Sequence, residues 1–201
     1  MSPRNLEILA YEDTELGPLC LRRRELLSEP GTVVTEVTLN HEFLMSSYNT
    51  DSERAISNRS ADIHGGSDLK ALVGGFGLGY TARELLKDKR VTSVEVIEYL
   101  PQVLQWLRDG LIPLSDELNG AADLRLTSGD VYQHLMSQPE QEYDLIVIDV
   151  DHSPADQLGS EEHAFYTAGG LELARRHLAD GGVLAVWSYA ESSSFSEAMN
   201  L

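Results

Sequence analysis

The sequence predicts an α/β protein with a doubly wound, mostly parallel sheet, preceded by a small N-terminal β unit. From residue 68 onward, short apolar strands alternate with amphipathic helices, and glycine or aspartate stands at the turns between them. The segment 143–149 is apolar on both faces, as a central parallel strand must be. Residues 1–60 instead carry short segments of alternating hydrophobicity, which are typical of antiparallel strands.

Length and composition are those of a globular protein with one full domain and an appendage. The chain has 201 residues, 42% of them hydrophobic and 24% charged. Its 33 acidic and 15 basic residues give a net charge of −18, which disfavours nucleic acid and anionic membranes as partners, because binding to phosphates requires cationic side chains. The N-terminus lacks the apolar stretch of a secretory signal, and no window approaches about 18 consecutive apolar residues. We therefore predict a soluble, cytoplasmic protein.

Cys20 is the single cysteine, and it lies in the apolar run Leu19-Cys20-Leu21. It is predicted to be a buried strand residue. One cysteine can form neither an internal disulfide nor a cysteine zinc site, and no metal is expected.

The small unit is predicted to span residues 1–60. Its segments 18–24 and 32–39 alternate in hydrophobicity, and the turn signal Glu29-Pro30-Gly31 between them predicts a hairpin. The polar stretch 46–60 is assigned to the same unit. Residues 61–67, with His64-Gly65-Gly66, are predicted to be the linker at the start of the larger unit, which spans 61–201.

The larger unit is predicted to contain five strands, each following a helix or a turn. The predicted strands are 69–73, 91–97, 124–126, 143–149 and 183–188, and the predicted helices are 81–89, 101–110, 130–135 and 167–178. Pro101 suits the first turn of its helix, and Gly110 suits the end. Asp130 is a good helix cap. Asp180-Gly181-Gly182 is predicted to separate the last helix from the last strand, and no further strand is expected in 190–201.

Ligands of an open parallel sheet bind beyond the carboxyl ends of its strands, so the residues after each strand are the candidates for a site. Gly75, Gly77 and Gly79 follow the first strand with the spacing GxGxG. This spacing lets the main chain approach a ligand and points helix amides at a negative group. A dinucleotide-binding GxGxxG would require glycine where Tyr80 stands, which disfavours NAD. The alternative is a tight glycine turn without a ligand.

Carboxylates follow the other strands. Glu98 lies 23 residues beyond the first glycine of GxGxG, near the distance at which an acidic residue binds ribose hydroxyls; the alternative is a solvated glutamate. Asp130 is placed to accept a hydrogen bond from an adenine amino group while it caps its helix. Asp149, Asp151 and His152 follow the central strand within four residues, so the reaction centre is expected there. The alternative for His152 is an ordinary surface residue.

Five segments together resemble one known family in their order and spacing. They are Val73–Ala82, Val94–Glu98, Thr127–Asp130, Tyr143–Asp149 and Phe165–Tyr166. In these segments the chain resembles the spermidine synthase family, the polyamine aminopropyltransferases. The resemblance implies a Rossmann-like fold of the class I S-adenosylmethionine methyltransferase type, with the family's small N-terminal β domain. It also implies a transferase of polyamine biosynthesis, and a homodimer, because members of the family are often dimers.

The resemblance implies a role for each candidate residue. The donor would be decarboxylated S-adenosylmethionine or S-adenosylmethionine. Its methionine-derived tail would lie along Gly75, Gly77 and Gly79, its ribose would bind Glu98 and its adenine would bind Asp130. Asp149 would be the catalytic base, and Asp151 and His152 would bind a small-molecule amine acceptor. A base is required because an amine with a pKa of about 10 must lose a proton before it attacks the carbon beside a sulfonium.

The chain also departs from the family's pattern. Gly77 stands where the family usually has an aspartate that holds the donor's ammonium, and an acid-free loop suits the carboxylate of S-adenosylmethionine. Residues 149–153 differ from the family's Asp-Ser-Ser-Asp-Pro, and the family's glutamine and Tyr-His-Glu elements are not recognisable in 44–58. Aminopropyl transfer to an amine is the expected function. A methyltransferase on the same fold and a non-catalytic nucleoside-binding protein stay open as alternatives.

The family normally continues with two more strands after the fifth. We therefore expect a truncated chain, in which the strand 183–188 is an exposed sheet edge.

Overall fold

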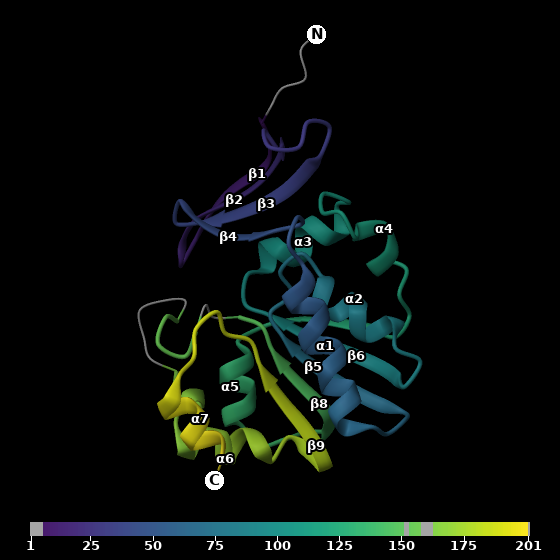
Figure 1. The fold of residues 1–201 in the computed structure, drawn as a ribbon, viewed down its shortest axis with the longest axis vertical. Coiled ribbons are helices and arrows are strands. Elements are labelled where there is room, and N and C mark those ends of the chain that lie inside the picture. Colours follow the sequence, from purple (N-terminus) through teal and green to yellow (C-terminus); the bar gives the residue numbers. More distant parts are fainter. Residues whose placement is uncertain (1–5, 151–152, 158–162, 201) are drawn as a thin grey trace.

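The computed structural model describes residues 6–150, 153–157 and 163–200, which form an antiparallel sheet and, below it in Figure 1, a parallel sheet with helices on both faces. The strands are β1 (Leu6–Thr14), β2 (Gly17–Glu25), β3 (Val33–Leu39), β4 (Glu42–Ser46), β5 (Leu69–Gly74), β6 (Val91–Glu98), β7 (Leu124–Ser128), β8 (Tyr143–Ile148) and β9 (Leu178–Val186). The helices are α1 (Asp51–His64), α2 (Tyr80–Lys87), α3 (Pro101–Arg108), α4 (Ser115–Leu118), α5 (Val131–Met136), α6 (Ala168–Arg175) and α7 (Ser193–Met199), with a 3-10 turn at Ala164–Tyr166.

The N-terminal sheet has four antiparallel strands in the order β1-β2-β3-β4. The predicted hairpin is confirmed as β2 and β3, and Cys20 is buried in β2 as predicted. Strands β1 and β4 were not predicted, because both are largely exposed or half-buried and carry little apolar alternation. The inner face of the sheet contributes Leu19, Leu21 and Val37 to the same core as the larger unit.

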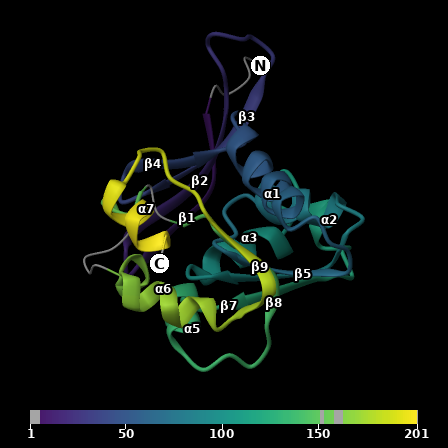
Figure 2. The same ribbon diagram turned by 60° about the horizontal axis from the view of Figure 1, so that its bottom comes forward.

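Residues 51–64 form helix α1, so the prediction of a linker from residue 61 is wrong for this segment. The helix was missed because the residues that it buries are Ser57, Ser60 and Ala61, which give no apolar periodicity. It ends at Gly65, whose φ of +68° is the left-handed conformation common after a helix. Helix α1 packs on α2 and on strands β8 and β9 (Figure 2), so it lies with the parallel sheet rather than with the antiparallel one.

The larger sheet has the strand order β7-β6-β5-β8-β9, with every pair parallel. Alternate residues of the central strands face opposite layers: Ala71 and Val73 pack with α2 and α3, whereas Leu72 and Ile146 pack with α5 and α6. The predicted doubly wound sheet is confirmed. From β5 the strand order runs outward through β6 to β7, and from β8 it runs outward in the opposite direction to β9. The switch point, where a ligand is expected, therefore lies between β5 and β8.

The C-terminal elements differ in detail from the prediction. Helix α6 ends at Arg175, and β9 already begins at Leu178, so the predicted turn 180–182 lies inside the strand. A shift in register against β8 accommodates these residues, and Gly181 has a φ of +78°. Helix α4 was not predicted, since it is a single turn. No helix within the described residues is long and apolar enough to cross a membrane.

Two hydrogen bonds hold the antiparallel sheet on the larger unit. Trp106 Nε1 on α3 donates to Glu12 Oε1 at 2.9 Å, and the Tyr99 hydroxyl donates to Glu15 Oε2 at 3.2 Å. The Tyr99 contact lies at the carboxyl end of β6, because Tyr99 directly follows that strand. The sheet is thereby placed over the edge at which a ligand is expected.

Candidate active site

The glycine turn after β5 depends on glycine for two different reasons. Gly75, Gly77 and Gly79 have φ values of +85°, +56° and +88°. A Cβ atom on Gly75 would lie 2.5 Å from the main-chain oxygen of Asp149, so only glycine lets this turn contact the end of β8. A Cβ on Gly79 would instead lie 2.5 Å from Leu118 Cδ1, so glycine here leaves room for α4 to pack beside the start of α2.

Glu98 ends β6 and is 7% exposed. Its Oε2 accepts a hydrogen bond from the Phe76 N–H, and its Oε1 accepts one from the Leu100 N–H, both at 2.8 Å. Burial raises the pKa of this carboxyl, and the main-chain hydrogen bonds oppose the shift by stabilising the ionised form. Glu98 therefore joins the glycine turn of β5 to the end of β6.

Asp130 lies between β7 and α5 and caps the helix, as predicted. Its Oδ1 accepts hydrogen bonds from the main-chain N–H groups of Tyr132 at 2.8 Å and Gln133 at 3.2 Å. The residue is half-buried, so its side chain is fixed without being sealed from solvent.

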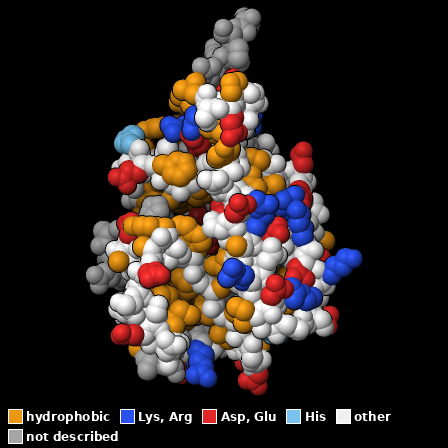
Figure 3. All heavy atoms as spheres, viewed as in Figure 1, with side chains coloured by type: hydrophobic (Ala, Val, Ile, Leu, Met, Phe, Trp, Pro, Cys, Tyr) orange, Lys and Arg blue, Asp and Glu red, His pale blue; other side chains and the backbone are white. Residues whose placement is uncertain are grey.

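A cavity of about 330 Å³, here called the β6-side cavity, brings most of these groups together. Gly75, Gly77, Glu98, Asp130 and Asp149 all line it, whereas Gly79 is not among the residues that do. Its other walls come from Leu16, Leu44 and Met45 of the antiparallel sheet and from Tyr132 and His163, whose rings are 4.2 Å apart between centroids. In the space-filling view, hydrophobic side chains gather where the antiparallel sheet meets the larger unit (Figure 3).

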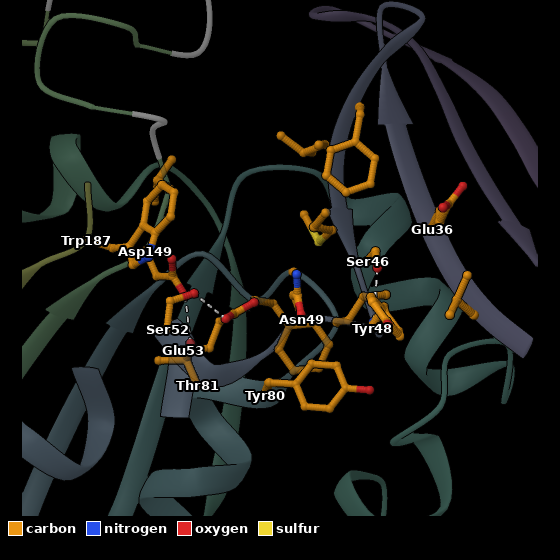
Figure 4. Close-up of a pocket in the computed structure, with 18 of the residues that line it drawn as sticks. Glu36, Ser46, Tyr48, Asn49, Ser52, Glu53, Tyr80, Thr81, Asp149 and Trp187 are labelled. Carbon is orange, nitrogen blue, oxygen red and sulfur yellow. Dashed lines mark hydrogen bonds between the residues drawn. The ribbon is translucent and has the colours of Figure 1, made fainter. Parts of the chain in front are cut away.

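A second cavity of about 420 Å³, the α1-side cavity, lies next to the first. Tyr48, Glu53, Tyr80 and Trp187 line it, and Figure 4 shows Glu53 and Asp149 at one end with Ser52 between them. The Ser52 hydroxyl donates to Glu53 Oε2 at 2.6 Å. Five residues line both cavities: Leu44, Met45, Gly77, Asp149 and Val150. The two cavities therefore meet at these residues, and Asp149 is the one among them with an ionisable side chain.

Asp149 directly follows the central strand β8. Its main-chain N–H donates to Gly74 O at 2.9 Å, and its Oδ2 accepts a hydrogen bond from Thr81 Oγ1 at 2.6 Å. Burial raises the pKa of Asp149 to about 6, the Thr81 hydroxyl opposes this, and the charge of Glu53 adds to it. At neutral pH the group is therefore a carboxylate that can readily take up a proton.

Sequence reasoning missed several residues of these cavities. Trp187 directly follows β9, so the same carboxyl-end rule could have found it. Glu53 lies in the helix that was predicted as part of the small β unit, and Met45 comes from the unpredicted strand β4. Asp151 and His152 lie outside the described residues. Among the residues that are described, no group of three or more His, Cys, Asp or Glu side chains could hold a metal ion.

Comparison with known proteins finds relatives by sequence and by structure. No profile of a known protein family matches the chain. The chain is 35% identical over 127 residues to polyamine aminopropyltransferase 2 of Streptomyces coelicolor, which is 61% of this chain and 22% of that protein. The chain thus spans about a fifth of the length of this curated relative.

Spermidine synthases share the fold at low sequence identity. The structure from Thermotoga maritima has a TM-score of 0.69 at 16% identity, covering 89% of this chain and 56% of that one. A spermidine synthase in complex with the transition-state analogue AdoDATO gives 0.67 at 16% identity, covering 89% and 55%. A probable spermidine synthase from Corynebacterium glutamicum gives 0.63 at 16% identity, covering 90% and 63%. These structural similarities confirm the predicted fold, and the sequence match to a polyamine aminopropyltransferase agrees with the resemblance inferred from the sequence.

Proposed function

We propose that the chain is a spermidine synthase-like transferase, which binds an S-adenosyl nucleoside in the β6-side cavity and transfers its aminopropyl group to an amine in the α1-side cavity. The observation that carries the proposal is the position of Asp149, which lines both cavities at the end of the central strand. The sequence similarity to a polyamine aminopropyltransferase supports aminopropyl transfer among the reactions that this fold can host.

The β6-side cavity has groups that suit each part of the nucleoside. A carboxylate oxygen has more than one lone pair, so Glu98 can accept from ribose hydroxyls while it keeps its hydrogen bonds to the Phe76 and Leu100 N–H groups. Asp130 can accept from the adenine amino group in the same way. The adjacent, tilted rings of Tyr132 and His163 offer an aromatic wall to the purine.

The α1-side cavity suits a cationic amine. Glu53 and Asp149 supply negative charge, and the rings of Tyr80 and Trp187 attract cations through their faces. In the proposed reaction, Asp149 accepts a proton from the acceptor's ammonium. The nitrogen lone pair then attacks the carbon beside the donor's sulfonium, and the carbon–sulfur bond breaks with its electron pair going to sulfur. The products are the alkylated amine and a neutral thioether nucleoside, and Asp149 later releases its proton to water.

One observation favours S-adenosylmethionine-dependent methyl transfer as the second candidate. The glycine turn has no acid between Gly74 and Gly79, and Met45 Sδ lies 3.1 Å from where a Cβ on Gly77 would be. A thioether at this point does not repel the carboxylate of S-adenosylmethionine. Donor preference therefore separates the two candidates.

The direct test is calorimetric titration with S-adenosylmethionine, its decarboxylated form and methylthioadenosine, side by side. We expect the decarboxylated donor to bind more tightly than S-adenosylmethionine, and to be consumed when an amine is added. Tighter binding of S-adenosylmethionine would instead support methyl transfer. Binding of a donor without turnover on any amine would support a non-catalytic nucleoside-binding protein.

Replacing Glu53 by glutamine is expected to weaken binding of the amine without affecting binding of the nucleoside. A hydrogen bond between ammonium and carboxylate contributes about 1.5–3 kcal/mol, so the KM for the amine should rise roughly tenfold or more. Because the charge of Glu53 raises the pKa of Asp149, the rise of kcat/KM with pH should also move to lower pH in this variant. Steady-state kinetics between pH 5 and 8, about the range in which Asp149 titrates, measure both effects.

Glu84→Gln is the matched control for this experiment. Glu84 lies on the neighbouring helix α2 and accepts a hydrogen bond from Asn58, but it is not among the residues that line either cavity. Equal changes in both variants would show that general surface charge, rather than contact with the amine, is responsible.

A further inference from the structure

Thr81 is fixed between three elements at the base of the α1-side cavity. It lies in the first turn of α2 and is 3% exposed. Its hydroxyl donates to Asp149 Oδ2 at 2.6 Å, and its main-chain oxygen accepts a hydrogen bond from Ser57 Oγ of α1 at 3.0 Å. Figure 4 shows the Thr81 side chain directed at the Asp149 carboxylate. The buried hydroxyl of Thr81 thus joins α2 to the end of β8, and its main-chain oxygen joins α2 to α1.

The hydrogen bond distinguishes the two oxygens of the Asp149 carboxylate. A threonine hydroxyl has one proton to donate, and here that proton is directed at Oδ2. An O–H···O hydrogen bond to an ionised carboxylate is among the stronger ones in proteins, so it restrains rotation of the carboxylate. Because Oδ2 is held by Thr81, Oδ1 is the carboxylate oxygen left to receive a proton from a group in the cavities that Asp149 lines.

We propose that Thr81 is a positioning residue for the transfer: by binding Oδ2, it holds Asp149 so that Oδ1 receives the proton of the acceptor amine. The inference rests on the proposed function of Asp149. On the described elements packed around this carboxylate, Glu53 of α1 is the charged group that faces it, whereas α2 presents the Thr81 hydroxyl and β9 is followed by the neutral Trp187.

Two substitutions separate positioning from simple packing. Thr81→Val keeps the branched shape and removes the hydroxyl, whereas Thr81→Ser keeps the hydroxyl and removes a methyl group. If Thr81 positions Asp149, the serine variant should behave like the original protein and the valine variant should not. If Thr81 only fills space beside Ser57 and α1, the order of the two variants should be reversed.

The experiment measures amine transfer and the titration of Asp149 in each variant. Loss of correct placement can cost about 10²-fold, so kcat of Thr81→Val should fall by about this factor while the nucleoside Kd stays unchanged. The hydroxyl stabilises the carboxylate, so Asp149 in Thr81→Val should titrate at higher pH, as followed by carbon-13 NMR of its side chain with Asp149→Asn for assignment. Thr81→Ser should restore both quantities.

Thr92→Val is the matched control, because the Thr92 hydroxyl donates to Leu69 O at the opposite end of the sheet. It should change neither kcat nor the titration. A Thr81→Val protein with unchanged kcat and unshifted titration would overturn the proposal, as would a serine variant that is no better than the valine variant. Absence of aminopropyl transfer by the unmodified protein would refute the proposed function instead. The titration needs no substrate, so it would still test whether the Thr81 hydroxyl stabilises the Asp149 carboxylate.

Discussion

Replacing Asp149 by asparagine is expected to lower kcat for transfer to an amine by about 10²–10⁴, because an amide cannot accept the acceptor's proton. Nucleoside affinity should stay nearly intact, since Glu98, Asp130 and the glycine turn are unchanged in this variant. Single-turnover kinetics and calorimetric titration measure the two quantities separately. Unchanged turnover would remove Asp149 from its proposed role.

The same substitution should make the protein more stable above pH 6. The pKa of Asp149 is raised from 3.8 to about 6 in the folded protein, so folding favours the neutral form. The resulting stabilisation is fully present below about pH 4 and is lost as pH rises through about 6. Asparagine is neutral at every pH, so the free energy of unfolding of this variant at pH 8 should exceed that of the original protein by about 3 kcal/mol. Chemical denaturation at pH 4 and pH 8 should show the difference at the higher pH alone.

Replacing Glu98 by glutamine is expected to weaken nucleoside binding and destabilise the fold together. Both carboxylate oxygens of Glu98 accept main-chain N–H groups, and the amide of glutamine would turn its own N–H toward one of them. A buried donor left unsatisfied costs about 1–3 kcal/mol of unfolding free energy. Loss of a charge-assisted hydrogen bond to ribose should lower nucleoside affinity by about tenfold or more.

Glu95→Gln is the control for nucleoside affinity. Glu95 lies on the same strand but contacts Tyr143 and Gln141 away from the cavities. Calorimetric titration should show normal affinity for this variant and reduced affinity for Glu98→Gln. An unaffected affinity in Glu98→Gln would show that the nucleoside does not contact Glu98.

The parallel sheet could be predicted from the sequence because its signals are local. The apolar segment 143–148, Pro101 at a helix start and Asp130 as a cap each specify their element from a few neighbouring residues. Helix α1 could not be predicted in this way. It is stabilised by contacts of small side chains such as Ser57 with α2, which do not appear as a hydrophobic pattern.

Part of the candidate site could be predicted for a similar reason. Residues that follow parallel strands must meet at one edge of the sheet, and the structure does bring Gly75, Glu98, Asp130 and Asp149 together there. Glu53 and Met45 reach the same place from a helix and a strand that are distant in sequence. Their positions depend on how α1 and the antiparallel sheet pack, which no short-range pattern specifies.

Gly75 and Gly77, near the junction of the cavities, differ in whether another residue could replace them. A side chain on Gly75 would collide with the main-chain oxygen of Asp149, which cannot move without displacing β8. A side chain on Gly77 would meet only the flexible thioether of Met45, and its φ of +56° is one that aspartate and asparagine tolerate. An acidic residue could therefore be gained or lost at 77 in one mutational step while Asp149 stays in place. Under the proposed function, sites descended from one ancestor could in this way come to prefer different donors while each keeps Asp149 as its base.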